Sequence, residues 1–143
     1  MTSTRICCTR PGSAAAFVLV LAVTSCSQRG AASDLLEIER VQSGGLNVVL
    51  LSNDGTLSNG KDALTIEFRR GDTLVDVGTV KAAATMPMAG LPEMQGSIFL
   101  NRGDVPGRYT AETDLSMSGG WTLRIQWDGP AGKGSAQLQA TVE

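Results

Sequence analysis

Apolar and polar residues alternate along most of the chain after Leu46, and this alternation predicts β-strands. It is clearest in Trp121–Trp127, where a large apolar side chain occupies every second position and a polar side chain stands between. Successive side chains of a strand point to opposite faces, so a period of two predicts a strand with one buried face. The same pattern occurs in Asp62–Arg70, whose apolar positions are Leu64, Ile66 and Phe68.

Seven segments of strand length follow one another, separated by turn signals such as Asn53-Asp54-Gly55. The predicted strands are 46–52, 62–70, 73–84, 97–101, 108–115, 121–127 and 135–142. About seven short strands within roughly 100 residues are typical of an all-β sandwich. The pattern of 34–42 leaves a helical turn and an approach strand open, and Gly44-Gly45 interrupts it.

The N-terminus has the composition of an export signal. Arg5 and Arg10 precede an apolar run, 13–24, that is shorter than the ~20 residues needed to span a bilayer as a helix. The run ends in Val-Thr-Ser before Cys26, which resembles the lipobox of bacterial lipoproteins, where a small residue precedes a lipidated cysteine. An uncleaved signal anchor is the alternative.

The lipobox resemblance implies a division of the chain into a signal peptide, 1–25, a lipidated linker, 26–45, and a folded domain, 46–143. Lipid on Cys26 would hold the protein at a membrane surface without spanning it. Ser27, which follows the cysteine in place of Asp, resembles the outer-membrane sorting pattern of Gram-negative lipoproteins. We therefore expect a lipid-anchored protein on the periplasmic face of the cell envelope.

Composition narrows the function classes. The chain holds no histidine, and its 12 basic and 14 acidic residues give a net charge of −2. Neither nucleic acid nor an anionic lipid surface is an expected partner at this charge. Histidine is the commonest general base, and the two cysteines other than Cys26 lie in the predicted signal peptide, so we expect a protein that is not an enzyme.

The methionines are the candidate metal ligands. Apart from Met1 there are four: Met86, Met88 and Met94 in one stretch broken by Pro and Gly, and Met117 shortly before Trp121. A thioether is a soft, uncharged ligand that suits Cu(I) or Ag(I). Without histidine or a free thiol, we expect Cu(II) and Zn(II) to bind poorly.

The local sequence suggests how these side chains could gather on a loop. Met86 and Met88 are two residues apart and would point the same way in extended backbone, with Pro87 fixing the chain between them. Gly90 and Pro92 would fold the loop so that Met94 returns. Trp121 is a potential cation–π cap, and Glu93 a less favoured ligand. Two alternatives remain: the methionines pack as an apolar plug, or they form a patch for a protein partner.

The chain from about Asn47 to Val142 resembles the YtkA-like, or FixH-like, envelope domain family. The resemblance is carried by Met-Pro-Met-x-Gly-x-Pro-x-Met in 86–94 and by Asp-Leu-Ser-Met-x-Gly-x-Trp in 114–121. It implies an Ig-like β-sandwich, found in lipoproteins or near copper-efflux and oxidase-assembly proteins. The family often has a further methionine where this chain has Leu91, which leaves the number of sulfur ligands open.

Two hypotheses follow. In the first, a lipid-anchored β-sandwich binds Cu(I) or Ag(I) through Met86, Met88, Met94 and Met117, for copper handling, tolerance or delivery. In the second, the methionine loop docks a protein of an efflux or oxidase-assembly complex and no metal is involved.

Overall fold

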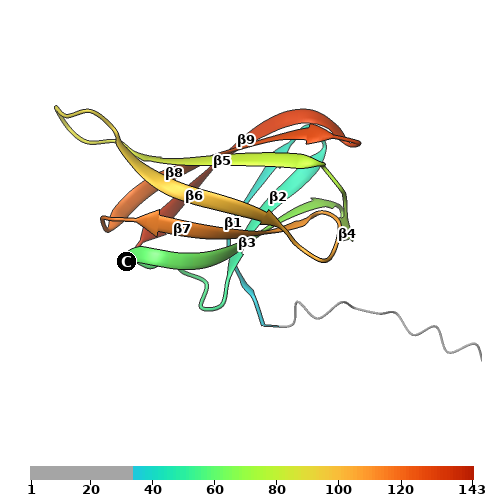
Figure 1. Ribbon diagram of the computed structural model, residues 1–143, viewed down its shortest axis with the longest axis horizontal. Helices are drawn as coiled ribbons and strands as arrows, with labels where there is room; N and C mark the ends of the chain where they lie inside the picture. The colour runs from blue at the N-terminus through green and yellow to red at the C-terminus, as the bar shows by residue number, and fades with distance from the viewer. Residues whose placement is uncertain (1–33) are drawn as a thin grey trace, which may run out of the picture. The chain divides into compact units, whose positions relative to one another are not determined.

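The computed structural model describes residues 34–143, and every regular element in that range is a β-strand (Figure 1). The strands are β1 (Leu36–Ser43), β2 (Leu46–Ser52), β3 (Gly60–Arg70), β4 (Thr73–Leu74), β5 (Thr79–Met86), β6 (Met94–Arg102), β7 (Arg108–Leu115), β8 (Gly119–Gly129) and β9 (Gly132–Val142). The prediction of an all-β fold is confirmed. The predicted signal peptide and the lipidation site at Cys26 lie outside the described residues. Residues 34–143 contain no apolar helix of membrane-spanning length.

The strands form one sheet that curls nearly into a barrel. Their order is β1-β2-β3-β7-β6-β5-β8-β9, with β4 paired to β3 beside this path. The first and last strands of the order meet at a seam, where Ser43 Oγ donates to the Ser135 carbonyl oxygen at 2.7 Å. The described chain therefore has nine strands in one continuous sheet, where the sequence pattern predicted about seven strands in a sandwich.

One additional strand comes from the segment that the pattern left undecided. Ser43 pairs with Leu46, and the two residues between them, Gly44 and Gly45, have φ values of 60° and 76°. Positive φ at both central residues is the geometry of a tight hairpin turn, so the two glycines join β1 to β2 rather than ending a linker. The folded domain begins before Leu46, and the predicted linker boundary at residue 45 is too late.

The second additional strand arises because the predicted strand 73–84 is two strands. Thr73 and Leu74 pair with β3, whereas Thr79–Met86 pairs with β8 across the barrel. The segment 75–78, which crosses from β4 to β5, turns where the Gly78 amide donates to Asp76 Oδ1 at 2.9 Å. Gly78 has a φ of 75°, and an added Cβ would lie 2.7 Å from the Asp128 carbonyl oxygen, so this crossing requires glycine.

The core confirms the predicted inner faces of the strands. Trp121, Leu123, Ile125 and Trp127 are all buried, and so are the alternating apolar residues of β3 and β9. The Phe68 ring lies edge-to-face against Tyr109 and Trp127, with ring centroids 5.6 Å and 5.3 Å apart. Apolar burial on the strands' inner faces supplies the main stabilisation of a domain that has no disulfide in the described residues.

On the outer face of the sheet, one buried carboxylate and two arginines connect neighbouring strands. Glu67 of β3 is fully buried and accepts from Arg69 Nε at 2.6 Å and from Arg108 Nε at 2.7 Å. Because Arg108 lies directly opposite Glu67 on β7, this arginine clasp (Glu67, Arg69 and Arg108) connects two strands. A buried carboxylate needs such partners to balance its lost hydration.

Candidate functional site

Two of the four candidate methionines lie directly opposite each other in the β5–β6 hairpin. Met86 is the last residue of β5, Met94 is the first residue of β6, and the two are Cα partners in the antiparallel ladder. Both were expected on a loop, and this expectation was wrong, because β5 continues to Met86 and β6 begins at Met94. The ladder stops there because the residue after Met86 is Pro87, which has no backbone N–H to donate, and Pro92 lies two residues before Met94.

Both side chains belong to the inner face of the sheet. Directly opposite residues of an antiparallel pair share a face, and the next pair on that face is Ala84 and Gly96, with Ala84 buried. Met86 and Met94 are half-buried and pack against the apolar core. The two thioethers therefore lie at the rim of the core, at one end of the barrel.

The tip of the hairpin extends beyond this pair (Figure 1). Met88 is half-buried in the tip, and its carbonyl oxygen accepts from the Leu91 amide at 3.4 Å across a turn in which Gly90 has a φ of 73°. Leu91 is 62% exposed, and Glu93 is also exposed. The tip thus presents a large apolar side chain, Leu91, to solvent.

A second segment, 116–119, which runs from the turn after β7 into the first residue of β8, contacts both methionines of the pair. Ser116 Oγ donates to Met94 Sδ at 3.6 Å. At Gly119, an added Cβ would lie 2.6 Å from Met86 Cε, so the Met86 methyl group occupies the space that a side chain would need. Met117 lies between these contacts and is 39% exposed.

Trp121 lies beneath this group. Its indole is fully buried, and Nε1 donates to the Met117 carbonyl oxygen at 2.9 Å, which fixes the turn relative to the core. The ring packs against Gly96, where an added Cβ would lie 3.0 Å from Trp121 Cζ3 and 2.3 Å from Leu115 Cδ2. The indole thus anchors the Met117 turn to the core, and its role as a cation–π cap stays a prediction.

We call this region the methionine end: Met86, Met94, Ser116 and Met117, with Met88 in the adjoining tip. The structure brings residues that are 22 and 33 positions apart in sequence, Met94 with Ser116 and Met86 with Gly119, to one end of the barrel. Sequence reasoning named the four methionines and Trp121 but missed Ser116 and Gly119. Their position immediately beside Met117 was the available signal, although nothing local indicated which methionine each would contact.

The donor chemistry at the methionine end is neutral and soft. Thioether sulfur does not gain or lose a proton, so its capacity to bind a metal does not depend on pH in the way that histidine's does. Within residues 34–143, no group of three or more His, Cys, Asp or Glu side chains is placed to hold a metal ion. The candidate ligands at the methionine end are thioethers, a ligand type that suits a soft metal ion.

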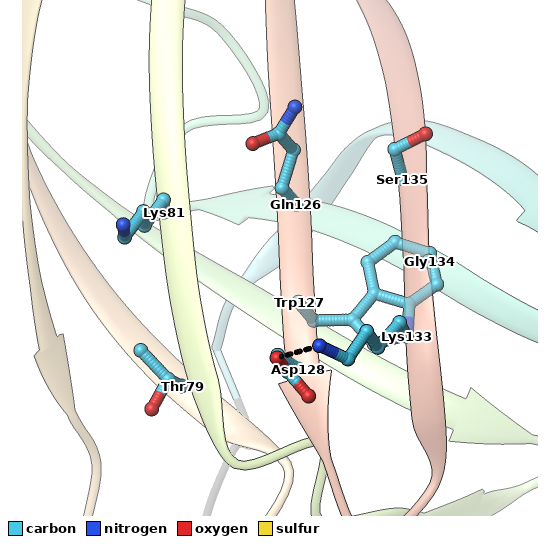
Figure 2. Close-up of a pocket in the computed structure, with 8 residues that line it drawn as sticks. All are labelled: Thr79, Lys81, Gln126, Trp127, Asp128, Lys133, Gly134 and Ser135. Carbon is cyan, nitrogen blue, oxygen red and sulfur yellow. Dashed lines mark ion pairs between the residues drawn. The ribbon is translucent and has the colours of Figure 1, made fainter.

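The hollow drawn in Figure 2 lies elsewhere, on the outer face of β5, β8 and β9, and no methionine lines it. Lys133 Nζ pairs with Asp128 Oδ2 at 2.8 Å there, and this hydrogen bond raises the pKa of Lys133. The Trp127 indole lies across β9 at Gly134, where an added Cβ would be 2.3 Å from Cζ2. Because the hollow is open and its ion pair is exposed, it offers no enclosed set of ligands.

Comparison with known protein families identifies the family of this chain. A family model described as YtkA-like matches residues 40–126. The chain belongs to the YtkA-like family. The matched range runs from β1 into β8 and contains Trp121 and all four methionines of the candidate site. Searches of the curated proteins and of the solved structures gave no match. The predicted membership of the YtkA-like family is confirmed, and kinship with FixH-like domains stays a prediction.

Proposed function

We propose that this YtkA-like protein binds Cu(I), or Ag(I), at the methionine end, as a lipid-anchored envelope protein that handles or delivers copper and catalyses no reaction. Met86, Met94 and Met117 would supply sulfur from the barrel rim, and Met88 from the tip. The observation that carries the proposal is the direct pairing of Met86 with Met94, which contact Gly119 and Ser116 on either side of Met117 in the chain. Clustered neutral thioethers favour a soft monovalent ion over harder cations.

The position of the pair supports reversible binding. The two strands fix the Met86 and Met94 backbones, so little ordering entropy is lost there when a ligand binds. Met88 and Met117 lie in the tip and in a turn, where a side chain can reorient more easily. We infer that the paired methionines hold the ion and that the exposed ones admit and release it.

The test is competition for Cu(I) against a bathocuproine-type chelator. Replacing Met86, Met88 and Met94 together by Leu keeps apolar bulk and removes three sulfurs. We expect this variant to lose Cu(I) affinity by more than about tenfold, or ~1.4 kcal/mol. If it competes as well as the parent chain, the metal proposal is wrong.

Two substitutions that each add one methionine, at opposite ends of the barrel, provide the matched control. Leu91→Met adds a thioether in the hairpin tip and is expected to strengthen Cu(I) binding. Ala131→Met adds one in the turn between β8 and β9, at the opposite end of these strands, and is expected to leave binding unchanged. Equal effects of both substitutions would indicate nonspecific binding to any exposed methionine.

The second candidate function is a metal-free interaction module of an efflux or oxidase-assembly complex. The exposure of Leu91 and Met117, at 62% and 39%, favours it, because two large apolar side chains at one end suit contact with a protein. A Leu91→Ser variant removes the apolar contact and no sulfur. Loss of partner binding in this variant, together with a parent chain that never competes for Cu(I), would favour the second function.

A further inference from the structure

Strand β6 has a strand neighbour on only one side for most of its length. It pairs with β5 at three positions, Met94 to Gly96, whereas its pairing with β7 covers Ser97 to Arg102. Beyond Gly96 the two strands of the hairpin diverge, as β5 follows β8 and β6 follows β7 (Figure 1). In the described chain, the edge of β6 from Ser97 to Arg102 is therefore open to another strand.

This edge lacks the features that normally prevent strand addition. Natural edge strands carry charges, proline or a β-bulge. The stretch Gln95–Asn101 has no charged residue and no proline, and its register with β7 runs without a shift. At its centre are Ile98, Phe99 and Leu100, and Ile and Phe are typical of strands.

Apolar side chains flank the open edge on both faces of the sheet. Phe99 lies on the outer face and is 66% exposed, the highest exposure of any large apolar residue in the described chain. Ile98 and Leu100 lie on the inner face but are only half-buried, because β5 has moved away from them. An additional strand on this edge would cover all three side chains and satisfy the free backbone groups.

We propose that the open edge pairs antiparallel, over residues 97–101, with the same edge of a second copy of the chain, around a two-fold axis at Phe99. In this register Phe99 faces Phe99 on the outer face, and Ile98 faces Leu100 on the inner face. Ser97 faces Asn101. Directly opposite residues share a face, so apolar groups meet apolar groups at every inner position.

Charge favours a second copy as the occupant. Self-pairing of a charged strand brings like charges together, but 97–101 is neutral. The first charge beyond it, Arg102, is ion-paired with Asp76 on its own chain. The contact is isologous and closes on itself, so it gives a dimer and not a fibre. It uses the end of β6 away from Met94 and does not depend on copper binding.

Photo-cross-linking in the membrane tests the proposal on the full chain. A benzoylphenylalanine at position 99 is expected to cross-link to residues 97–101 of a second copy, identified by mass spectrometry of the joined peptides. The same residue at Gln126, an outer-face position of β8 with strands on both sides, is the control and is expected to give no such product. A cross-link from position 99 to a different protein, or none, would overturn the proposal.

A charge-pair experiment gives an independent readout. Two copies with different affinity tags are co-expressed, and their co-purification is measured. Phe99→Lys in both copies is expected to abolish it, since two ammonium groups would face each other across the axis. Phe99→Lys in one copy with Phe99→Glu in the other is expected to restore it. Co-purification that persists with lysine in both copies contradicts the proposed pairing. Phe99 is exposed in the single chain, so the substituted chain should stay folded and keep the β circular-dichroism spectrum of the parent.

Discussion

Tyr109 connects the core to the segment that crosses from β4 to β5. It is the single tyrosine of the chain and is buried beside Phe68, while its hydroxyl donates to the Gly78 carbonyl oxygen at 2.7 Å. That carbonyl belongs to the segment that crosses from β4 to β5. The hydroxyl therefore satisfies a backbone acceptor that no ladder reaches.

Burial raises the pKa of Tyr109 above its usual value, and the nearby Asp76 carboxylate raises it further. Because the folded-state pKa is raised, this contribution to stability is complete below about pH 10 and is lost as pH rises through the folded-state value. We expect the phenolate absorbance to appear at higher pH in the folded chain than in the chain unfolded by urea.

The tyrosine titration has a simple control, because Tyr109→Phe removes the only phenol. This variant should show no phenolate signal and should lose about 1 kcal/mol of stability with its hydrogen bond. Identical titration midpoints in the folded and unfolded chains would contradict the predicted shift.

At the residue scale, sequence reasoning identified the chemistry but not the contacts. Met86, Met88, Met94 and Met117 could be named because soft ligands and chain breaks are visible in local sequence. The packing of Met86 over Gly119 could not be predicted from the sequence, because it depends on where β8 begins relative to β5. Residues far apart in sequence can meet only when the register is known.

At the scale of elements, the arginine clasp joins β3 to β7 on the outside of the barrel. Glu67 is fully buried, while the Arg69 and Arg108 side chains are 29% and 18% exposed. Removing one partner of a buried ion pair is costly because the remaining charge loses its compensation. Here the guanidinium groups partly reach water, which moderates the cost.

We expect Glu67→Gln to lower the free energy of unfolding by ~2–4 kcal/mol, measured by urea denaturation. The matched control is Asp128→Asn, which removes the carboxylate of an exposed ion pair with Lys133 and should have little effect. Similar losses in the two variants would mean that burial of Glu67 is not what makes its ion pairs important.

The elements also show why the number of strands was underestimated. Gly44-Gly45 was interpreted as an interruption, although two glycines between two apolar runs also indicate a tight hairpin. The division of 73–84 into β4 and β5 had a local signal in Gly78, since a glycine inside a strand pattern weakens that strand. In both cases the turn geometry of the glycine was decided by which strands pair.

At the scale of the whole molecule, β1 closes the curled sheet. It pairs with β2 along most of its length and meets β9 through the hydrogen bond from Ser43 to Ser135. Its half-buried Ile38 and Val41 pack against the core. β1 is thus part of the barrel and not of a linker.

We expect a chain that begins at Leu46 to melt at a lower temperature than one that begins at Asp34. A loss of at least ~1 kcal/mol, or a shift of about 4–8 °C for a domain of this size, should be measurable by circular dichroism. The chain from Asp34 serves as the control, because it keeps β1 and lacks only residues that precede the described part. Equal melting temperatures would show that β1 adds nothing to the stability of the barrel.

The sequence by itself determined the inner faces of strands such as β3 and β8, the all-β class and the set of candidate soft ligands. These depend on a period of two, on Gly and Pro, and on side-chain chemistry, all of which are local. The tertiary structure decided that nine described strands share one sheet, that Met86 pairs with Met94 beside the Met117 turn, and that β6 keeps an open edge. Those features depend on pairing and register between distant segments, which are fixed only when the apolar faces close together around one core.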